Sequence, residues 1–259
     1  MITNGNQSTR SISFMGMVSS LALASGCAID TGADDSTESP VVEATQELRR
    51  QDRPDFQILG PEGKIRGTTY EQWSADWWRW AYSIPASTNP LLDTTGEFCD
   101  EGQQGPVFFL AGNFGGTVTR SCTVPHNKPL FFPLNNLAAD NCGVPPENQL
   151  PIEDIIDLQE HFADFVTALT LEVDGTVIGD DKTELDPFLI DVTEFSYFVP
   201  DEDSLYDVFG LDFAGTCSPS FSAGYYVMLS LARGEHTVHF SAAQVSGFAL
   251  DVTYNLTVR

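Results

Sequence analysis

The chain has 259 residues, of which 37 are Asp or Glu and 12 are Lys or Arg, so its formal net charge is −25 at pH 7. Such an acidic protein repels nucleic acid and anionic membrane surfaces, and we therefore expect no nucleic-acid partner. The sequence also lacks a stretch of ~20 apolar residues that could span a membrane as a helix.

The first 26 residues have the pattern of a targeting segment. Arg10 precedes an apolar run from Ile12 to Ala24, which is too short to span a bilayer. The run ends in LASGC, where small residues precede Cys27. This pattern resembles the lipobox of bacterial lipoproteins, which implies that Cys27 is lipidated and becomes the mature N-terminus. The alternative is an ordinary signal peptide with a chance cysteine.

The lipoprotein interpretation predicts a membrane partner through the lipid anchor. It places the protein in the bacterial cell envelope, either in the periplasm or at the cell surface. Residues 27–53 are rich in Ser, Thr, Asp and Glu and offer too little apolar surface to offset the entropy lost on folding. We therefore predict a disordered acidic tether at 27–53.

All four tryptophans lie at residues 68–85, TTYEQWSADWWRWAYSIP, whose spacing predicts an amphipathic helix. Thr68 and Glu71 fit a capping box, and Pro85 ends the helix. The expected buried stripe consists of Tyr70, Trp73, Trp77, Trp80, Ala81 and Ile84. Trp78 lies off this stripe, so we expect a partly exposed ring there and take it as the candidate ligand-binding residue. The alternatives for these rings are burial in the core and an exposed platform for sugars.

The remainder of the chain consists mostly of strand-like segments. We predict strands at 107–111, 117–124, 130–134, 169–173, 188–198, 225–231, 236–242 and 248–258, and a second helix at 151–168. The segment 107–111 is apolar on both faces, which predicts a central strand. Hairpin turns and the absence of a βαβ rhythm indicate one mainly β domain at 54–259. We expect an antiparallel β-sandwich, jelly-roll or Ig-like, with two packed helices.

Four cysteines remain once Cys27 is set aside. An even number in an exported protein predicts two disulfides, and four cysteines allow three pairings. We favour Cys99–Cys122 and Cys142–Cys217. A zinc site is not expected, because Cys122 and His126 have no second close pair to complete it. We therefore expect neither a metal nor a cofactor.

The sequence contains none of the common catalytic motifs. The G-x-S-x-G nucleophile elbow, the H-E-x-x-H zinc motif, the P-loop and the dinucleotide-binding fingerprint are all absent. The four histidines are expected at surface or capping positions, with His236 and His239 on opposite faces of one strand. The cluster Asp201-Glu202-Asp203 is expected to be a solvated loop. A carboxylate pair for glycoside hydrolysis stays open, because the separation of two carboxylates depends on the fold.

Three motifs carry a resemblance to known proteins. WSADWWRWAYSIP at 73–85, CTVPHNKPLFFP at 122–133 and GEHTVHF at 234–240 resemble an uncharacterised group of secreted bacterial proteins without a known activity. The resemblance implies a single exported domain and assigns no functional residue.

The sequence therefore favours an exported, lipid-anchored protein whose acidic β-sandwich acts as a binding or adhesion module, with a glycan as one candidate ligand. One alternative is a secreted polysaccharide hydrolase that uses a carboxylate pair. The other is a structural protein of the cell envelope.

Overall fold

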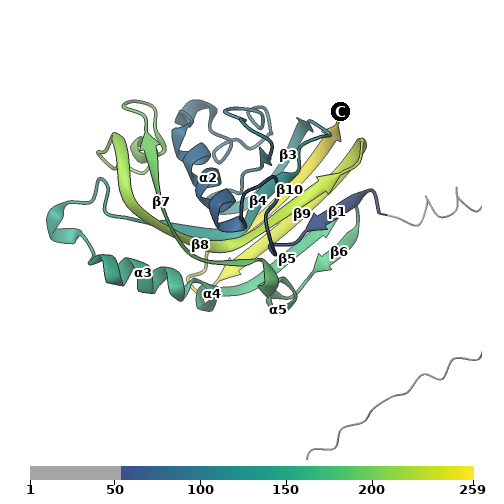
Figure 1. The fold of residues 1–259 in the computed structure, drawn as a ribbon. Helices are drawn as coiled ribbons and strands as arrows, with labels where there is room; N and C mark the ends of the chain where they lie inside the picture. The colour runs from purple at the N-terminus through teal and green to yellow at the C-terminus, as the bar shows by residue number, and fades with distance from the viewer. Residues whose placement is uncertain (1–53) are drawn as a thin grey trace, which may run out of the picture. The chain divides into compact units, whose positions relative to one another are not determined.

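The computed structural model describes residues 54–259, and the predicted signal segment, Cys27 and the tether lie outside the described residues. Two mixed sheets pack against each other, which confirms a mainly β sandwich (Figure 1). The first sheet has the order β1 (Phe56–Leu59), β8 (Gly215–Leu231), β4 (Leu130–Ala139) and β2 (Phe108–Phe109), and β7 (Leu189–Val199) also pairs with β8. The second has the order β3 (Gly116–Val124), β10 (Ala249–Val258), β9 (Gly234–Gln244), β5 (Val166–Val173) and β6 (Thr176–Gly179).

Two strand pairs are parallel, which adds to the antiparallel pairs expected from hairpins. β2 runs parallel to β4, and β10 runs parallel to β3. The chain between β2 and β4 passes through β3 in the other sheet, and such a crossover returns it to the same end of the sheet. The turns visible in the sequence describe neighbouring strands only, so they carried no information about these long-range pairs.

The core has two parts that share the first sheet. One lies between the sheets and includes Phe132 and Phe240, whereas the other lies between the first sheet and helix α2 (Tyr70–Ser83) and includes Phe131 and Tyr226. Successive residues of β4 thus enter different parts of the core, as strand geometry requires. Figure 1 shows α2 lying over β4 and β8.

The position of α2 over the first sheet explains why the prediction of a central strand at 107–111 is wrong. The segment 107–111 was expected to be a central strand, but β2 contains only Phe108 and Phe109 and forms the end of its sheet. Phe108 packs between the sheets, whereas Phe109 packs under α2. A helix on the outer face of the sheet therefore explains burial on both sides.

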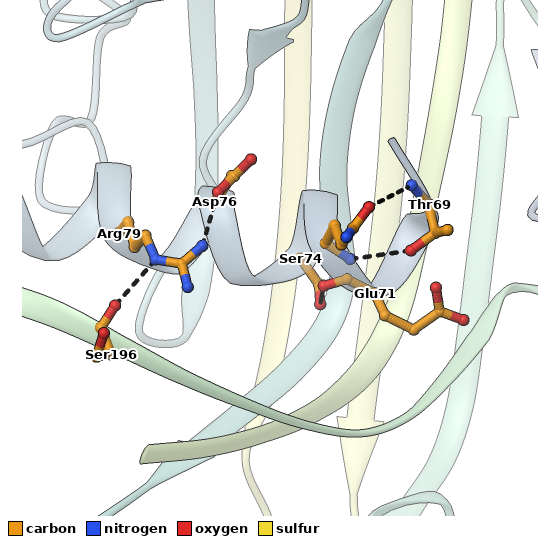
Figure 2. A network of polar contacts seen from close by, with 7 residues as sticks. Thr69, Glu71, Ser74, Asp76, Arg79 and Ser196 are labelled. Carbon is orange, nitrogen blue, oxygen red and sulfur yellow. Dashed lines mark hydrogen bonds and ion pairs between the residues drawn. The ribbon is translucent and has the colours of Figure 1, made fainter. Parts of the chain in front are cut away.

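Helix α2 begins one residue later than predicted. Thr69, rather than Thr68, is the N-cap, and Gln72, rather than Glu71, completes the capping box (Figure 2). The Thr69 side chain accepts from the Gln72 amide at 3.4 Å, and the Gln72 side chain accepts from the Thr69 amide at 3.1 Å. The helix ends before Ile84, which is extended and precedes Pro85 as expected.

The second predicted helix is shorter than expected. α3 (Ile152–Glu160) is followed by the single turn α4 (Phe162–Phe165), and β5 begins at Val166. Pairing of β5 with β9 overrides the helical spacing there. The remaining short helices are α5 (Lys182–Leu185), α6 (Leu205–Val208), η1 (Ala86–Thr88), η2 (Pro146–Asn148) and η3 (Asp186–Phe188).

Both favoured disulfides are present. Cys99–Cys122 joins the segment before β2 to β3, and Cys142–Cys217 joins the segment after β4 to the start of β8. The opposite orientation of His236 and His239 is also confirmed, but His236 is not at the surface. It is buried with Nδ1 2.7 Å from an Asp174 carboxylate oxygen, because its side of β9 faces the core.

Candidate functional site

Trp78 is buried, which contradicts the expectation of a partly exposed ring. Only 8% of the residue is accessible. Trp77 meets its ring edge-on at a centroid distance of 5.0 Å, and Tyr82 stacks on it at 5.4 Å. The ring is off the main stripe, as the spacing indicated, but it packs into a second layer of aromatic side chains.

These rings form one wall of a cavity of about 280 Å³, which we call the β4 pocket. Its lining comes from four parts of the chain. They are α2 with the nearby Leu91 (Trp77, Trp78, Tyr82, Leu91), the segment before β3 (Gly112, Asn113, Phe114), β4 (Pro133–Ala138) and the β9–β10 hairpin (Gln244, Phe248, Leu250). The pocket therefore lies along β4, with α2 on one side and the end of the second sheet on the other.

The polar groups of the β4 pocket are carboxamides. Gln244 donates to the Asn135 side-chain oxygen at 2.8 Å, and Asn136 donates to the Tyr226 hydroxyl at 2.9 Å. Within residues 54–259, no hydrogen bond engages the Asn135 side-chain NH₂ group or the Asn136 side-chain oxygen. The indole N–H of Trp78 is buried and makes no hydrogen bond of standard geometry among the described residues. Burial raises the pKa of the Tyr226 hydroxyl, and the Trp78 N–H lies close enough to this hydroxyl to lower that pKa in part, against the larger effect of burial. The two asparagines thus give the pocket an unused donor and an unused acceptor within residues 54–259.

A bulge in β4 presents the two asparagines to the pocket. The register with β8 shifts between Pro133 and Asn135, so that β4 has one extra residue there. Gly224 lies opposite Asn136, and a Cβ atom on it would be 2.6 Å from the Asn136 Cβ. The glycine is thus required for the close approach of the two strands beside the bulge.

Arg120 holds in place the part of the β4 pocket lining that contains Gly112. It is 1% exposed, and its guanidinium donates to the carbonyls of Ala111 and Gly112 at 2.8 and 2.9 Å, and to the Tyr254 hydroxyl at 2.8 Å. It also donates to the Asp93 carbonyl at 2.8 Å. No carboxylate forms an ion pair with Arg120 in the described part of the chain, and its Nη2 has no partner there. Carbonyl dipoles thus stabilise this buried cation and fix the course of the chain at residues 111–112.

Charged groups are absent from the lining of the β4 pocket, as far as the described residues go. Its aromatic wall continues into a cluster of tyrosines, where Tyr82 stacks on Tyr197 at 4.2 Å and Tyr197 donates to the Asp140 carboxylate at 2.7 Å. Burial raises the pKa of Tyr197, so this hydroxyl stays protonated and remains a donor. Asp140 lies near Cys142 and Cys217, but their disulfide removes the thiolates that a metal ion would need.

A second hollow lies on the other flank of α2 and is lined by Trp73, Trp80, Asp76, Arg79 and the exposed Phe198, among others. Arg79 donates to Asp76 at 2.7 Å and to the carbonyl of Ser196 at 2.9 Å, as Figure 2 shows. The indole N–H groups of Trp73 and Trp80 both donate to main-chain carbonyls. These contacts connect α2 to β7 and leave the Trp donors occupied.

The sequence singled out Trp78 as a candidate but did not indicate the side chains that surround it in the pocket. Tyr82, Asn135, Asn136 and Gln244 come from three elements that only the fold brings together. One signal was present, because two consecutive asparagines interrupt the apolar strand LFFPLNNLAA. Such polar residues inside a buried strand require partners.

No family model matches the chain, and no curated protein matches it. Among solved structures, the chain is similar to one titled "Solution Structure of Amebosin", with 9% identity and a TM-score of 0.17 over 55% of this chain and 96% of the other. At this level the likeness supports no conclusion about fold or function. Within residues 54–259, no helix has the length and apolar character needed to cross a membrane.

Proposed function

We propose that this protein is an exported, lipid-anchored binding protein and that the β4 pocket is its binding site. The observation that carries the proposal is the uncharged lining of the pocket in a chain with a net charge of −25. Binding pockets combine apolar and aromatic walls with a few oriented polar groups, and the β4 pocket has this composition. The ligand is an uncharged group with an apolar body and at least one hydrogen-bonding function.

The lining favours binding over hydrolysis. A glycosidase needs two carboxyl groups beside the scissile bond, and the β4 pocket has neither Asp nor Glu among its lining residues. The described part of its lining also contains no histidine that could act as a general base. The polar side chains that it offers are carboxamides, which bind polar atoms without exchanging protons at neutral pH.

A glycine in the lining allows a direct test of the site. A Cβ atom on Gly112 would meet nothing within 4 Å, and the residue does not have a positive φ, so Gly112→Leu should fill the pocket without straining the backbone. Gly60 has the same freedom but lies outside the pocket lining, which makes Gly60→Leu the matched control.

The probe is N-phenyl-1-naphthylamine, an uncharged apolar dye that fluoresces when it leaves water. The unaltered protein and Gly60→Leu should enhance its emission saturably, and Gly112→Leu should lose most of the enhancement while its melting temperature stays within a few degrees. An undiminished signal in a folded Gly112→Leu protein would show that the dye binds elsewhere and would contradict the proposal.

A further inference from the structure

Among residues 54–259, no strand lies beside one edge of β4 for most of its length. β8 pairs with β4 from Leu130 to Ala139, but β2 pairs on the other side with Leu130 and Phe131 only. The last main-chain bond on that side runs from the Leu110 amide to the Phe131 carbonyl at 3.1 Å. From Phe132 to Ala139, the described residues contain no strand that pairs with this edge.

The free edge is a consequence of how the chain leaves β2. Arg120 and the Tyr254 hydroxyl bind the main chain of Ala111 and Gly112 and draw it away from β4. β2 shows that this edge accepts a strand, and after β2 the main chain of Ala111 and Gly112 bonds to Arg120 and Tyr254 instead of pairing with β4. The β4 pocket lies in the space so left, because Gly112 and residues 133–138 both line it.

The alternation of an antiparallel strand identifies the groups on the free edge. The Phe131 carbonyl points toward β2, so the main-chain N–H and C=O groups of every second residue of β4 point toward the same edge. The next is Pro133, which has no amide hydrogen and is tolerated at an edge for that reason. Beyond the bulge, the register places the main chains of Asn136 and Ala138 on the free edge. Both residues are partly exposed, and no described group outside β4 and β8 bonds to their main chains.

We infer that the free edge of β4 binds an extended, non-acidic polypeptide segment as an additional strand, an inference that rests on the β4 pocket being the binding site. Addition of a strand satisfies main-chain groups on the edge and takes alternate side chains into pockets. The β4 pocket has walls on both faces of the edge, with Trp78 and Tyr82 on one side and Gln244 and Phe248 on the other. Successive side chains of a strand point to opposite faces and so match these two walls.

Charge and hydrogen bonding determine the kind of segment. Acidic segments are repelled by the net charge of −25, whereas uncharged and basic segments are not. The NH₂ group of Asn135 and the side-chain oxygen of Asn136, which have no partner within residues 54–259, complement the carbonyl and amide of a peptide group. A sugar ring could use the aromatic wall, but it offers no row of donors and acceptors at strand spacing.

The experiment starts with a display library of random 12-residue peptides. The library is selected for binding to the full protein and is depleted of peptides that also bind the Gly112→Leu variant. A selected peptide is then synthesised with N-methyl groups at one amide at a time. Methyl groups on the alternate amides that face β4 should weaken binding at least tenfold, and those on the intervening amides should change it less than threefold. Equal effects at all positions would overturn strand addition.

Ala138→Pro provides a test from the protein side. It removes an amide hydrogen from the free edge and leaves the pairing with β8 intact, as Pro133 does in the natural chain. This variant should lose at least tenfold in peptide affinity while its melting temperature stays within a few degrees. Ala138→Val is the matched control, because it enlarges the same pocket-lining side chain but keeps the amide hydrogen, and it should lose less than threefold. Unchanged peptide affinity in Ala138→Pro would overturn the inference.

The outcomes also separate the two proposals. Recovery of no peptide, or displacement of the dye by neutral oligosaccharides alone, would overturn the peptide ligand and leave the β4 pocket as the site. Dye binding that Gly112→Leu does not reduce would overturn the site itself. Slower hydrogen exchange of the Asn136 and Ala138 amides in the peptide complex would support strand addition, and unchanged exchange would contradict it.

Discussion

Trp77 and Trp78, the two central tryptophans of α2, differ in the hydrogen bonding of the indole N–H. The Trp77 indole N–H donates to the Leu110 carbonyl at 2.9 Å, whereas the buried Trp78 N–H makes no hydrogen bond of standard geometry among residues 54–259 and has the Tyr226 hydroxyl close by. A buried donor without a well-formed hydrogen bond contributes less to stability than one with a partner. The N–H of Trp77 is therefore the more important of the two for stability, although both rings line the β4 pocket.

Replacement by phenylalanine tests the difference. Trp77→Phe removes the bond to the Leu110 carbonyl and leaves that carbonyl unpaired, whereas Trp78→Phe removes a donor without a well-formed hydrogen bond. We expect Trp77→Phe to lower the free energy of unfolding by ~1–3 kcal/mol more than Trp78→Phe. Urea denaturation of both variants measures this. Equal losses would mean that Trp78 has an acceptor in solution.

Asp93 gives a prediction about pH. Burial raises the pKa of this carboxyl, but hydrogen bonds from Thr95 and Phe98 outweigh burial, so the pKa lies below its ordinary value of 3.8. A carboxyl with a lowered native pKa stabilises the fold above the ordinary pKa and loses this effect as the pH falls through the native pKa. Asp93→Asn should therefore be less stable than the unaltered protein at pH 7.

The difference in stability between Asp93→Asn and the unaltered protein should narrow only below pH 3.8, where Asp93 of the unaltered protein becomes protonated. Thermal melts between pH 7 and pH 2 measure it. Asp93→Glu is the control, because it keeps the charge but displaces the carboxylate from the amides. A gap that stays constant down to pH 2 would contradict the assignment.

At the scale of the element, α2 is determined by its ends as much as by its aromatic stripe. The capping box at Thr69 satisfies amides that the first helical turn leaves free, and Pro85 stops the helix. Together they set the length of α2, and therefore which rings reach the β4 pocket.

Alanine substitutions at Thr68 and Thr69 test which of the two threonines is the N-cap of α2. Thr69→Ala should lower the free energy of unfolding by ~1 kcal/mol, the usual cost of losing an N-cap side chain. Thr68→Ala should change it by less than ~0.5 kcal/mol, because the Thr68 side chain makes no hydrogen bond in the described part of the chain. Chemical denaturation decides between them, and the reverse order would restore the cap at Thr68.

At the scale of the whole molecule, the function proposed here depends on charge and anchoring together. The net charge of −25 keeps the protein from binding anionic lipid through its surface. Attachment to a membrane therefore requires another device, and the lipobox-like sequence before Cys27 supplies a candidate.

Cys27→Ser should release the protein from the membrane fraction into the soluble fraction of a bacterial host that processes lipoproteins. A single acyl chain binds membranes only reversibly, and a lipoprotein modification provides several chains on one cysteine. Fractionation without detergent measures the change, and Ser25→Ala serves as a nearby control that keeps the cysteine. Membrane association of Cys27→Ser would rule out the lipid anchor.

Local features of the chain could be predicted from the sequence because neighbouring residues determine them. The alternation along 248–258 predicted β10, and the helical spacing predicted that Trp73, Trp77 and Trp80 are buried. Cysteine count and position led to both disulfides. In each case the physical cause is local: the spacing of apolar residues acts within one segment, and a disulfide can form only between cysteines.

Only the tertiary structure decided how these segments meet. The sequence by itself determined that the chain forms a sandwich with an aromatic helix, because the periods of strands and helices are local. It did not determine that α2 covers the outer face of the first sheet, or that Arg120 draws residues 111–112 away from β4. The β4 pocket and its free edge arise from contacts between residues far apart in the chain, and such contacts depend on the packing of whole elements, which no local pattern records.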